Sequence, residues 1–235
     1  MNVALIAPKD MLFWTSLGDM AFIVPSNVRL DFDFGNMYKM LDNGTYESGK
    51  PQNTDEFVTL ANKLQVDEIV LPDFIQRKDQ TLMSAEEFIT TVRKQWRYAG
   101  VPQGNDPLQW IECYEIMAEN PDIDVLCIPI WLQKKFGCRP AVVHKLLKDN
   151  KWCFSKEHHL IGLDGYGELM CFPKSLIRSV DTSLPFSRAN ANLEITFEDS
   201  KVSRISLDKP KFEIDGNYLL NRNITKLLEI AHHYA

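Results

Sequence analysis

Three aspartates and one glutamine stand at the ends of short apolar runs, where a fold can gather polar side chains. Asp42, Asp73 and Asp181 end the runs KMLD, IVLPD and IRSVD, and Gln103 ends YAGVPQ. Carboxylates acting without a metal suit glycosidic chemistry: one attacks an anomeric carbon while another moves the proton of the leaving group. Each aspartate alone could equally cap a helix or form a turn, and Asp42-Asn43-Gly44 is also a good tight turn.

The elements that must position these residues alternate along the chain. Seven runs are too short for helices and too uniformly apolar for half-exposed strands, so they predict strands buried on both faces. These runs are residues 3–8, 39–44, 67–73, 98–104, 124–130, 159–163 and 177–181.

Amphipathic helical patterns lie between several of the predicted strands. With their expected caps or first residues, they are 53–65 (Asn53 or Thr54), 84–96 (Ser84), 105–120 (Asp106) and 139–150 (Pro140). Glu87, three residues after Ser84, predicts a capping box.

Such repeated alternation implies parallel strands joined by right-handed crossovers. We therefore predict an α/β fold, a (β/α)8 TIM-like barrel whose eighth strand is not visible in the sequence. A doubly wound open sheet is the alternative, but no Gly-rich phosphate loop follows the first strand. In a barrel the C-terminal strand ends share one face, so the polar ends converge. They are Asp42-Asn43-Gly44, Asp73, Gln103-Gly104, Gly162 with Asp164, and Asp181.

The C-terminal part changes pattern without a linker or repeat. Alternating apolar and polar residues predict a β-hairpin within residues 191–220, and residues 221–235 form an amphipathic pattern that predicts a last helix. We treat residues 1–235 as one domain with this hairpin and helix appended.

The composition of the chain indicates the cellular environment in which it is expected to work. Five scattered cysteines without a CxxC pair favour a reducing cytosol over a disulfide framework, and neither a signal peptide nor a membrane segment is expected. The pairs His158-His159 and His232-His233 are not expected to share a metal, because adjacent strand residues point to opposite faces.

The net charge of −6 argues mildly against a pure nucleic-acid binder. Residues 134–151 are nevertheless basic, which indicates either a solvated helix face or a phosphate-binding stripe. The basic residues of this run are Lys134, Lys135, Arg139, Lys145, Lys148 and Lys151.

In order and content, five segments resemble the tRNA-guanine transglycosylases, and more closely their short phage relatives that place 7-deazaguanine bases in DNA. LDNGTYE (41–47) resembles the family's D-S-G-G-F-Q element, and VLPD (70–73) stands where the family has its base-reading aspartate. VPQG (101–104) is similar to V-Q-G, IGLDGYGEL (161–169) to G-L-A-V-G-E, and SVDTSLPFSRAN (179–190) to the region around the nucleophile.

The resemblance implies guanine exchange through a covalent intermediate, with no cofactor and no metal. Asp181 would attack C1′ of the target nucleotide and Asp42 would act as general acid and base. Asp73 would accept from the N1–H and N2–H₂ edge of guanine, and Gln103 would donate to O6. Further substrate contacts are expected from Asn43, Gly104, Gly162 and Leu163.

The resemblance also implies two partners, DNA and a free 7-deazaguanine base, in the cytoplasm (of the host, if the chain is phage-encoded). The expected phosphate contacts are Lys134, Lys135, Arg139, Arg178 and Arg188. Trp131 or Tyr166 could stack on a base, or simply pack in the core.

The family's cysteine and histidine zinc site is absent, and the chain lacks the length for tRNA-binding insertions. Both departures favour DNA over tRNA. Three alternatives stay open: the same exchange on tRNA, of the queuosine or archaeosine type, a glycosidase that releases guanine, and a binding module without turnover.

Overall fold

The computed structural model describes residues 1–163, 165–173, 175–195 and 214–234. Eight parallel strands form one sheet in the order β1-β8-β7-β6-β5-β4-β3-β2. They are β1 (Asn2–Leu5), β2 (Ala21–Ile23), β3 (Lys39–Leu41), β4 (Glu68–Val70), β5 (Arg97–Gly100), β6 (Val125–Pro129), β7 (Glu157–Ile161) and β8 (Ser179–Thr182).

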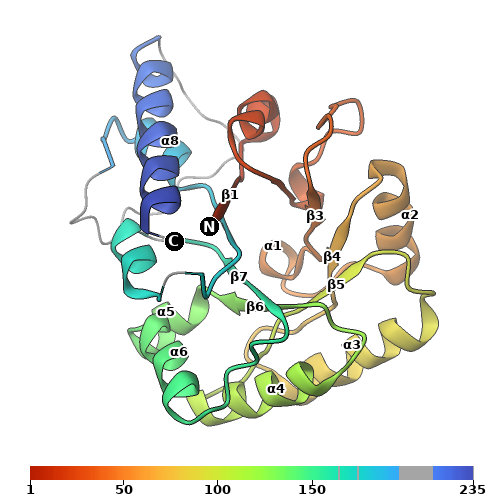
Figure 1. The fold of residues 1–235 in the computed structure, drawn as a ribbon. Coiled ribbons are helices and arrows are strands. Elements are labelled where there is room, and N and C mark those ends of the chain that lie inside the picture. Colours follow the sequence, from red (N-terminus) through yellow and green to blue (C-terminus); the bar gives the residue numbers. More distant parts are fainter. Residues whose placement is uncertain (164, 174, 196–213, 235) are drawn as a thin grey trace.

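The sheet closes on itself almost completely (Figure 1). The first and last strands pair in parallel, from Asn2 opposite Ser179 to Leu5 opposite Thr182. The strand pairing is weakest between β1 and β2, where a single bridge joins Ala4 to Met20. The predicted (β/α)8 TIM-like barrel is therefore confirmed, and the open-sheet alternative is excluded.

All seven predicted strands are present, and β2 is the eighth. Its three residues, Ala-Phe-Ile, are buried and follow the irregular 3₁₀ segment η1 (Lys9–Leu17), which takes the place of a first crossover helix. β2 lies in the apolar run of residues 20–25, which was overlooked in the sequence although β3 and β4 are equally short.

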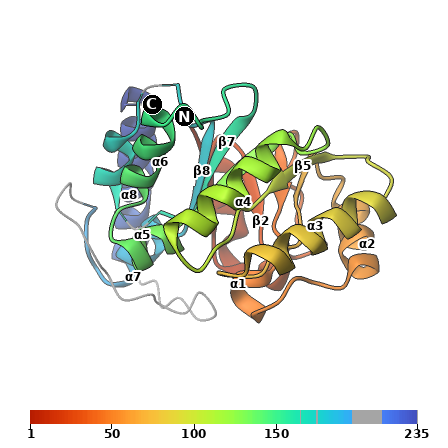
Figure 2. The same cartoon turned by 90° about the horizontal axis from the view of Figure 1, so that it is seen from below.

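Helices cover the outside of the barrel (Figures 1 and 2). They are α1 (Thr45–Ser48), α2 (Thr54–Leu64), α3 (Lys78–Thr91), α4 (Pro107–Glu119), α5 (Trp131–Phe136), α6 (Arg139–Lys148), α7 (Leu184–Asn190) and α8 (Ile214–Tyr234). Two further 3₁₀ segments are η2 (Pro25–Asn27) and η3 (Tyr166–Cys171). No helix in the described part of the chain is long and apolar enough to cross a membrane.

Of the four predicted helix starts, two were right, one was wrong, and α6 begins at Arg139, one residue before the predicted Pro140. Asn53 caps α2 by accepting from the backbone N–H groups of Asp55 and Glu56, and Asp106 caps α4. The capping box at Ser84 was wrong, because α3 already begins at Lys78. Thr81 explains the earlier start: its buried hydroxyl bonds the backbone N–H and C=O of Phe74, which ties the first turns of α3 to the loop after β4.

The predicted terminal helix is present but longer, since α8 begins at Ile214 rather than 221. It packs against β1, α7 and η3 through buried residues that include Leu220, Ile224 and Leu227. Most of the predicted hairpin, residues 196–213, lies outside the described residues.

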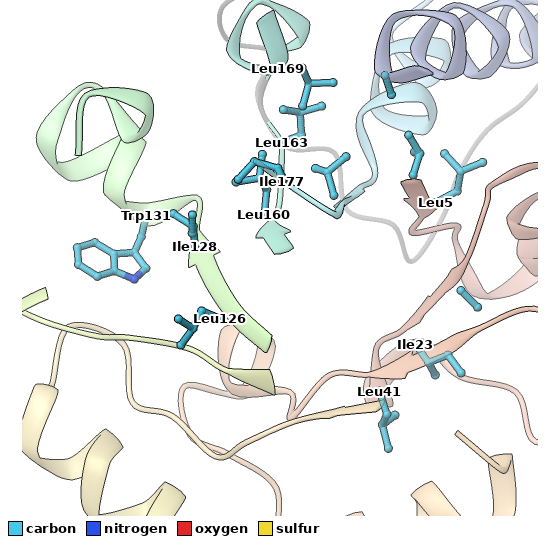
Figure 3. Packing of buried hydrophobic residues seen from close by; sticks show 14 of the residues in the cluster. Leu5, Ile23, Leu41, Leu126, Ile128, Trp131, Leu160, Leu163, Leu169 and Ile177 are labelled. Carbon is cyan, nitrogen blue, oxygen red and sulfur yellow. The ribbon is translucent and has the colours of Figure 1, made fainter. Parts of the chain in front are cut away.

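Side chains alternate between two apolar layers along each strand, as the two-residue period of a strand requires. The outer layer fills the space between strands and helices, and Figure 3 shows Leu5, Ile23, Leu41, Leu126 and Leu160 entering it from strands around the barrel. The inner layer fills the barrel itself. It consists of Ala4, Met20, Phe22, Val24, Met40, Val70, Ala99, Val101, Val125 and Cys127.

An ion-pair network closes the barrel at the N-terminal ends of its strands. The guanidinium of Arg178, just before β8, donates to both carboxylate oxygens of Glu68 at 2.8 and 2.9 Å. Glu68, the first residue of β4, is fully buried and also accepts from the hydroxyl of Tyr38 at 2.7 Å. Glu157 at the start of β7 pairs with both Arg178 and Arg97.

We expect Glu68→Gln to lower the free energy of unfolding by about 3 kcal/mol, because it leaves the guanidinium of Arg178 without its buried counter-charge. Glu157→Gln is the matched control. Its side chain is 46% exposed, so the loss should stay below about 1 kcal/mol. Urea denaturation measures both, and equal losses would show that burial of the Glu68 pair does not matter to stability.

Candidate active site

The polar strand ends predicted from the sequence do converge. Asp42, Asp73 and Gln103 follow β3, β4 and β5, and Asp181 lies near the C-terminal end of β8. Because the strands are parallel, these ends share one face of the barrel. All four side chains are buried, and Asp42 interacts electrostatically with both Asp73 and Asp181.

Asp73 is held by two amide side chains, one on each carboxylate oxygen. Asn43 donates to Oδ1 at 2.7 Å and Gln103 donates to Oδ2 at 2.5 Å. The orientation of the Gln103 amide is fixed, because its Oε1 accepts from the backbone N–H of Gln76 at 2.9 Å. This arrangement places the two acceptor oxygens of Asp73 beside the amide N–H₂ group of Gln103.

Asn43 therefore acts on Asp73. Its two N–H donors go to Asp73 and to the carbonyl of Leu71, and its Oδ1 accepts from the backbone N–H of Thr45. Because these hydrogen-bonding groups are all in use and the side chain is 2% exposed, Asn43 positions the neighbouring carboxylate.

Burial raises the pKa of Asp73 to about 6, although the hydrogen bonds from Asn43 and Gln103 act in the opposite direction. The group is thus mostly ionised at neutral pH and becomes protonated in mildly acidic solution. Its ability to accept hydrogen bonds from a ligand should be lost over the same range.

Asp42 is a buried carboxyl group fixed at the end of β3. Its backbone N–H continues the sheet by bonding the carbonyl of Ile23 at 2.9 Å, which fixes the carboxyl at the strand end. Burial raises its pKa well above the ordinary range, and the charges of Glu47, Asp73 and Asp181 add to this effect. Desolvation raises the pKa of Glu47 as well, and the charge of Asp181 acts in the same direction.

Asp181 has a different environment, because N–H groups face it. Its Oδ1 accepts from Nε2 of His159 at 3.0 Å and from the backbone N–H of Gly162 at 3.0 Å. Donors of this kind stabilise negative charge on a carboxylate. Asp42 and Asp181 therefore lie in different surroundings: burial and acidic neighbours raise the pKa of Asp42, whereas two N–H groups face Asp181.

His159 belongs to the site and was missed as a functional residue in the sequence. The alternation along β7 turns its ring into the barrel, whereas His158 points outward and bonds the hydroxyl of Tyr114 at 2.8 Å. The useful signal was this alternation: His159 shares a face with the residues of the barrel interior, two positions before the end of its strand.

Gly162 was predicted as a substrate contact, but its polar backbone groups have partners within the protein. The N–H of Gly162 is taken by Asp181 and its carbonyl accepts from Arg139. A left-handed φ of +74° and a Cβ position only 3.1 Å from Ile130 make glycine necessary here. Leu163 packs in the outer apolar layer.

Gly104 has a packing role. A Cβ at this position would lie 2.3 Å from the backbone nitrogen of Trp110, so only glycine lets the start of α4 approach β5. The tight approach fixes the loop that carries Gln103.

Two of the predicted phosphate-contact residues lie at the rim of this face. Lys135 donates to the side chains of Gln76 and Asn105, both at 2.6 Å, in the loops that follow β4 and β5. Lys134 lies 5.9 Å from the ring centre of Tyr46, which is half exposed on α1. These residues form an exposed basic and aromatic edge, which we call the rim.

Arg139 is not part of an exposed stripe, which corrects the prediction from sequence. Its side chain is fully buried and bonds both carboxylate oxygens of Glu168. It also donates to the carbonyls of Ile128, Ile161 and Gly162. The guanidinium thus joins the ends of β6 and β7 to η3.

Arg178 and Arg188 also differ from expectation. Arg178 lies at the opposite end of the barrel from Asp181, because it precedes β8 whereas Asp181 is near the end of that strand. Arg188 is 4% exposed within α7. Of the remaining basic run, Lys145 pairs with Asp149 and Lys151 with Glu115, which is typical of a solvated helix face.

The predicted stacking residues Trp131 and Tyr166 are 7% and 1% exposed, so both pack in the core. Asp164, another predicted strand-end acid, lies outside the described residues. Over the described ranges, no group of three or more His, Cys, Asp or Glu side chains is placed to hold a metal ion. No family model and no curated protein matches this sequence.

We expect the raised pKa of Asp73 to appear as a pH dependence of stability. The folded pKa of about 6 exceeds the unfolded value of about 3.9. The protonated carboxyl of Asp73 therefore contributes to the free energy of unfolding. This contribution is fully present below pH 4 and is lost as the pH rises through 6. From pH 4 to pH 7 the wild type should lose roughly 2 kcal/mol more than Asp73→Ala.

Urea denaturation at the two pH values measures this difference, and carboxyl ¹³C NMR gives the titration midpoint directly. Asp79→Ala, an exposed aspartate at the start of α3, controls for the loss of one acidic side chain. An ordinary midpoint near 4 for Asp73 would contradict the expectation.

Proposed function

We propose that this protein is a base-exchange transglycosylase that replaces guanine in DNA with a 7-deazaguanine derivative. The observation that carries the proposal is the contact between Asp73 and Gln103 beside the differently prepared carboxyl groups of Asp42 and Asp181. The five family-like segments of the sequence add the identity of the base and of the polymer.

The pair of Asp73 and Gln103 matches the hydrogen-bonding edge of guanine. Each carboxylate oxygen has two acceptor positions, so Asp73 keeps capacity for the N1–H and N2–H₂ donors after accepting from Asn43 and Gln103. The amide nitrogen of Gln103 carries a second proton for O6. Adenine has an acceptor at N1, which would face the carboxylate and leave buried polar groups unpaired.

The carboxyl groups of Asp181 and Asp42 divide the chemistry. Asp181 attacks C1′, an ester bond from its oxygen to C1′ forms, and the C1′–N9 bond breaks with its electron pair going to guanine. Asp42 gives its proton to the departing base. The incoming base then returns a proton to Asp42 while its nitrogen attacks C1′ and displaces Asp181. Two inversions give net retention.

Reaction at C1′ requires the target nucleotide to leave the base stack, so the substrate is single-stranded DNA or a flipped nucleotide. The rim supports this requirement. Lys134 and Lys135 are exposed beside the site and suit phosphates, and the half-exposed ring of Tyr46 suits a base.

We expect a covalent adduct between the protein and guanine-containing single-stranded DNA, visible by mass spectrometry of the intact protein. Asp181→Asn should abolish both the adduct and the incorporation of labelled 7-deazaguanine, because the amide is a poor nucleophile. Asp149→Asn, at the exposed end of α6, is the control and should behave as wild type.

Normal incorporation by Asp181→Asn would reject the nucleophile. Running the assay with tRNA beside DNA identifies the polymer. Release of free guanine without incorporation would indicate a glycosidase, and tight binding without an adduct would indicate a binding module.

We expect Lys134→Gln with Lys135→Gln to weaken the binding of single-stranded DNA. Each lysine that neutralises a phosphate adds roughly 0.7 to the slope of log affinity against log salt. The slope should therefore fall by roughly 1.4, as measured by fluorescence anisotropy at several salt concentrations.

The control pair is Lys145→Gln with Lys148→Gln, which removes the same charge from the exposed face of α6. Equal effects of the two pairs would mean that only the net charge matters, and that the rim is not a DNA contact.

A further inference from the structure

We infer that His159 is a positioning residue that holds Oδ1 of Asp181 and so leaves Oδ2 as the attacking oxygen, in a tautomer set by a hydrogen-bond chain from Arg178. The role in attack rests on the proposed function, whereas the hydrogen-bond chain does not.

The chain crosses the barrel interior in three steps. Nε of Arg178 donates to the hydroxyl of Ser179 at 3.1 Å. The hydroxyl of Ser179 lies 2.8 Å from Nδ1 of His159, and Nε2 of His159 lies 3.0 Å from Oδ1 of Asp181. Ser179 and His159 are fully buried, so each polar atom must be satisfied within the chain.

The direction of each hydrogen bond in this series follows from Arg178, the donor at its start. Arg178 has only donors, so the oxygen of Ser179 accepts from it. Within the described residues, the other hydrogen-bonding partner of the Ser179 hydroxyl is Nδ1 of His159, and the hydroxyl proton therefore goes to that nitrogen. Nδ1 is then an acceptor, and the ring carries its single proton on Nε2, where it donates to Asp181.

The other nitrogens of Arg178 already have hydrogen-bond partners. The two terminal nitrogens of Arg178 both bond Glu68, which leaves Nε for Ser179. At the far end, the ring of Phe22 from β2 stacks on His159, with ring centres 5.5 Å apart and planes 7° apart. The imidazole is thus held in its plane as well as in its tautomer.

These hydrogen bonds make the two carboxylate oxygens of Asp181 different from each other. In the described part of the chain, the two hydrogen bonds to its carboxylate both end on Oδ1. These bonds hold the carboxylate plane and lower the nucleophilicity of Oδ1. Oδ2 keeps its lone pairs for C1′.

Two substitutions separate the donor from the volume of the ring. The amide nitrogen of His159→Gln reaches the place of Nε2 and can still donate to Asp181, whereas His159→Leu cannot. We expect kcat to fall about 10²-fold in His159→Leu, the order expected for a misplaced reacting group, and less than about tenfold in His159→Gln. KM for the free base should be unchanged in both, because the base contacts Asp73 and Gln103.

The tautomer is measured on the full-length protein by ¹⁵N NMR of its five histidines, with the His159 signals identified by their loss in His159→Gln. The expected result is one ring proton, on Nε2, in the wild type. In Ser179→Ala the Nδ1 signal should shift, because that nitrogen loses its donor.

A ring proton on Nδ1, protons on both nitrogens, or equal kcat in His159→Leu and His159→Gln would overturn the inference. The NMR measurement needs no substrate. If the wild type exchanges no base, the proposed function fails, and the tautomer still decides the hydrogen-bond chain.

Discussion

The site depends on gathering several carboxyl groups at one end of a barrel while giving each a different way to meet the cost of burial. A buried carboxylate is destabilised unless it is protonated or faced by donors. Burial and acidic neighbours raise the pKa of Asp42, which favours its protonated form. Asp181 and Asp73 are the donor-faced cases, with His159 and Gly162 on one and Asn43 and Gln103 on the other. The three aspartates thus have three different surroundings, which is what the proposed division of roles requires.

The barrel supplies those surroundings through parallel register. Each strand delivers its last inward-facing side chain to the same face, and neighbouring strands then provide each other's partners: β3 and β5 for Asp73, β7 for Asp181. The loops that carry these partners are held by packing that only glycine permits, at Gly104 against Trp110 and at Gly162 against Ile130. A larger residue at either position would displace the loop that carries Gln103 or the N–H that faces Asp181.

Most of the fold could be predicted from the sequence, and so could four of the residues that converge at the candidate site. Seven buried strands were visible because each is a compact apolar run between polar segments. β2 lies in a similar run, residues 20–25, which was overlooked. Asp42, Asp73, Gln103 and Asp181 were found because they end strands. The hydrogen-bond roles of Asn43 and Gly162 depend on residues from neighbouring strands, and no local pattern contains that information.

The basic residues show why charge in a sequence does not locate a surface. All four residues are basic, but Arg139 and Arg178 are held in ion pairs with buried or nearly buried glutamates, whereas Lys134 and Lys135 are exposed at the rim. A guanidinium has several donors in a rigid fork, so it can bond carbonyls or carboxylates from several elements at once, whereas an ammonium on a flexible stem remains at the surface. In this fold the arginines join strands at the two ends of the barrel.

The two ends are also connected through the interior. The Glu68–Arg178 pair closes the N-terminal end, and the same arginine reaches Asp181 at the other end through Ser179 and His159. A buried ion pair contributes little net stability compared with apolar packing of the same volume, so stability alone does not account for its presence. Its geometry gives a second reason: an arginine with both terminal nitrogens fixed has one remaining donor in one direction, and that direction determines which nitrogen of His159 carries the proton that faces Asp181.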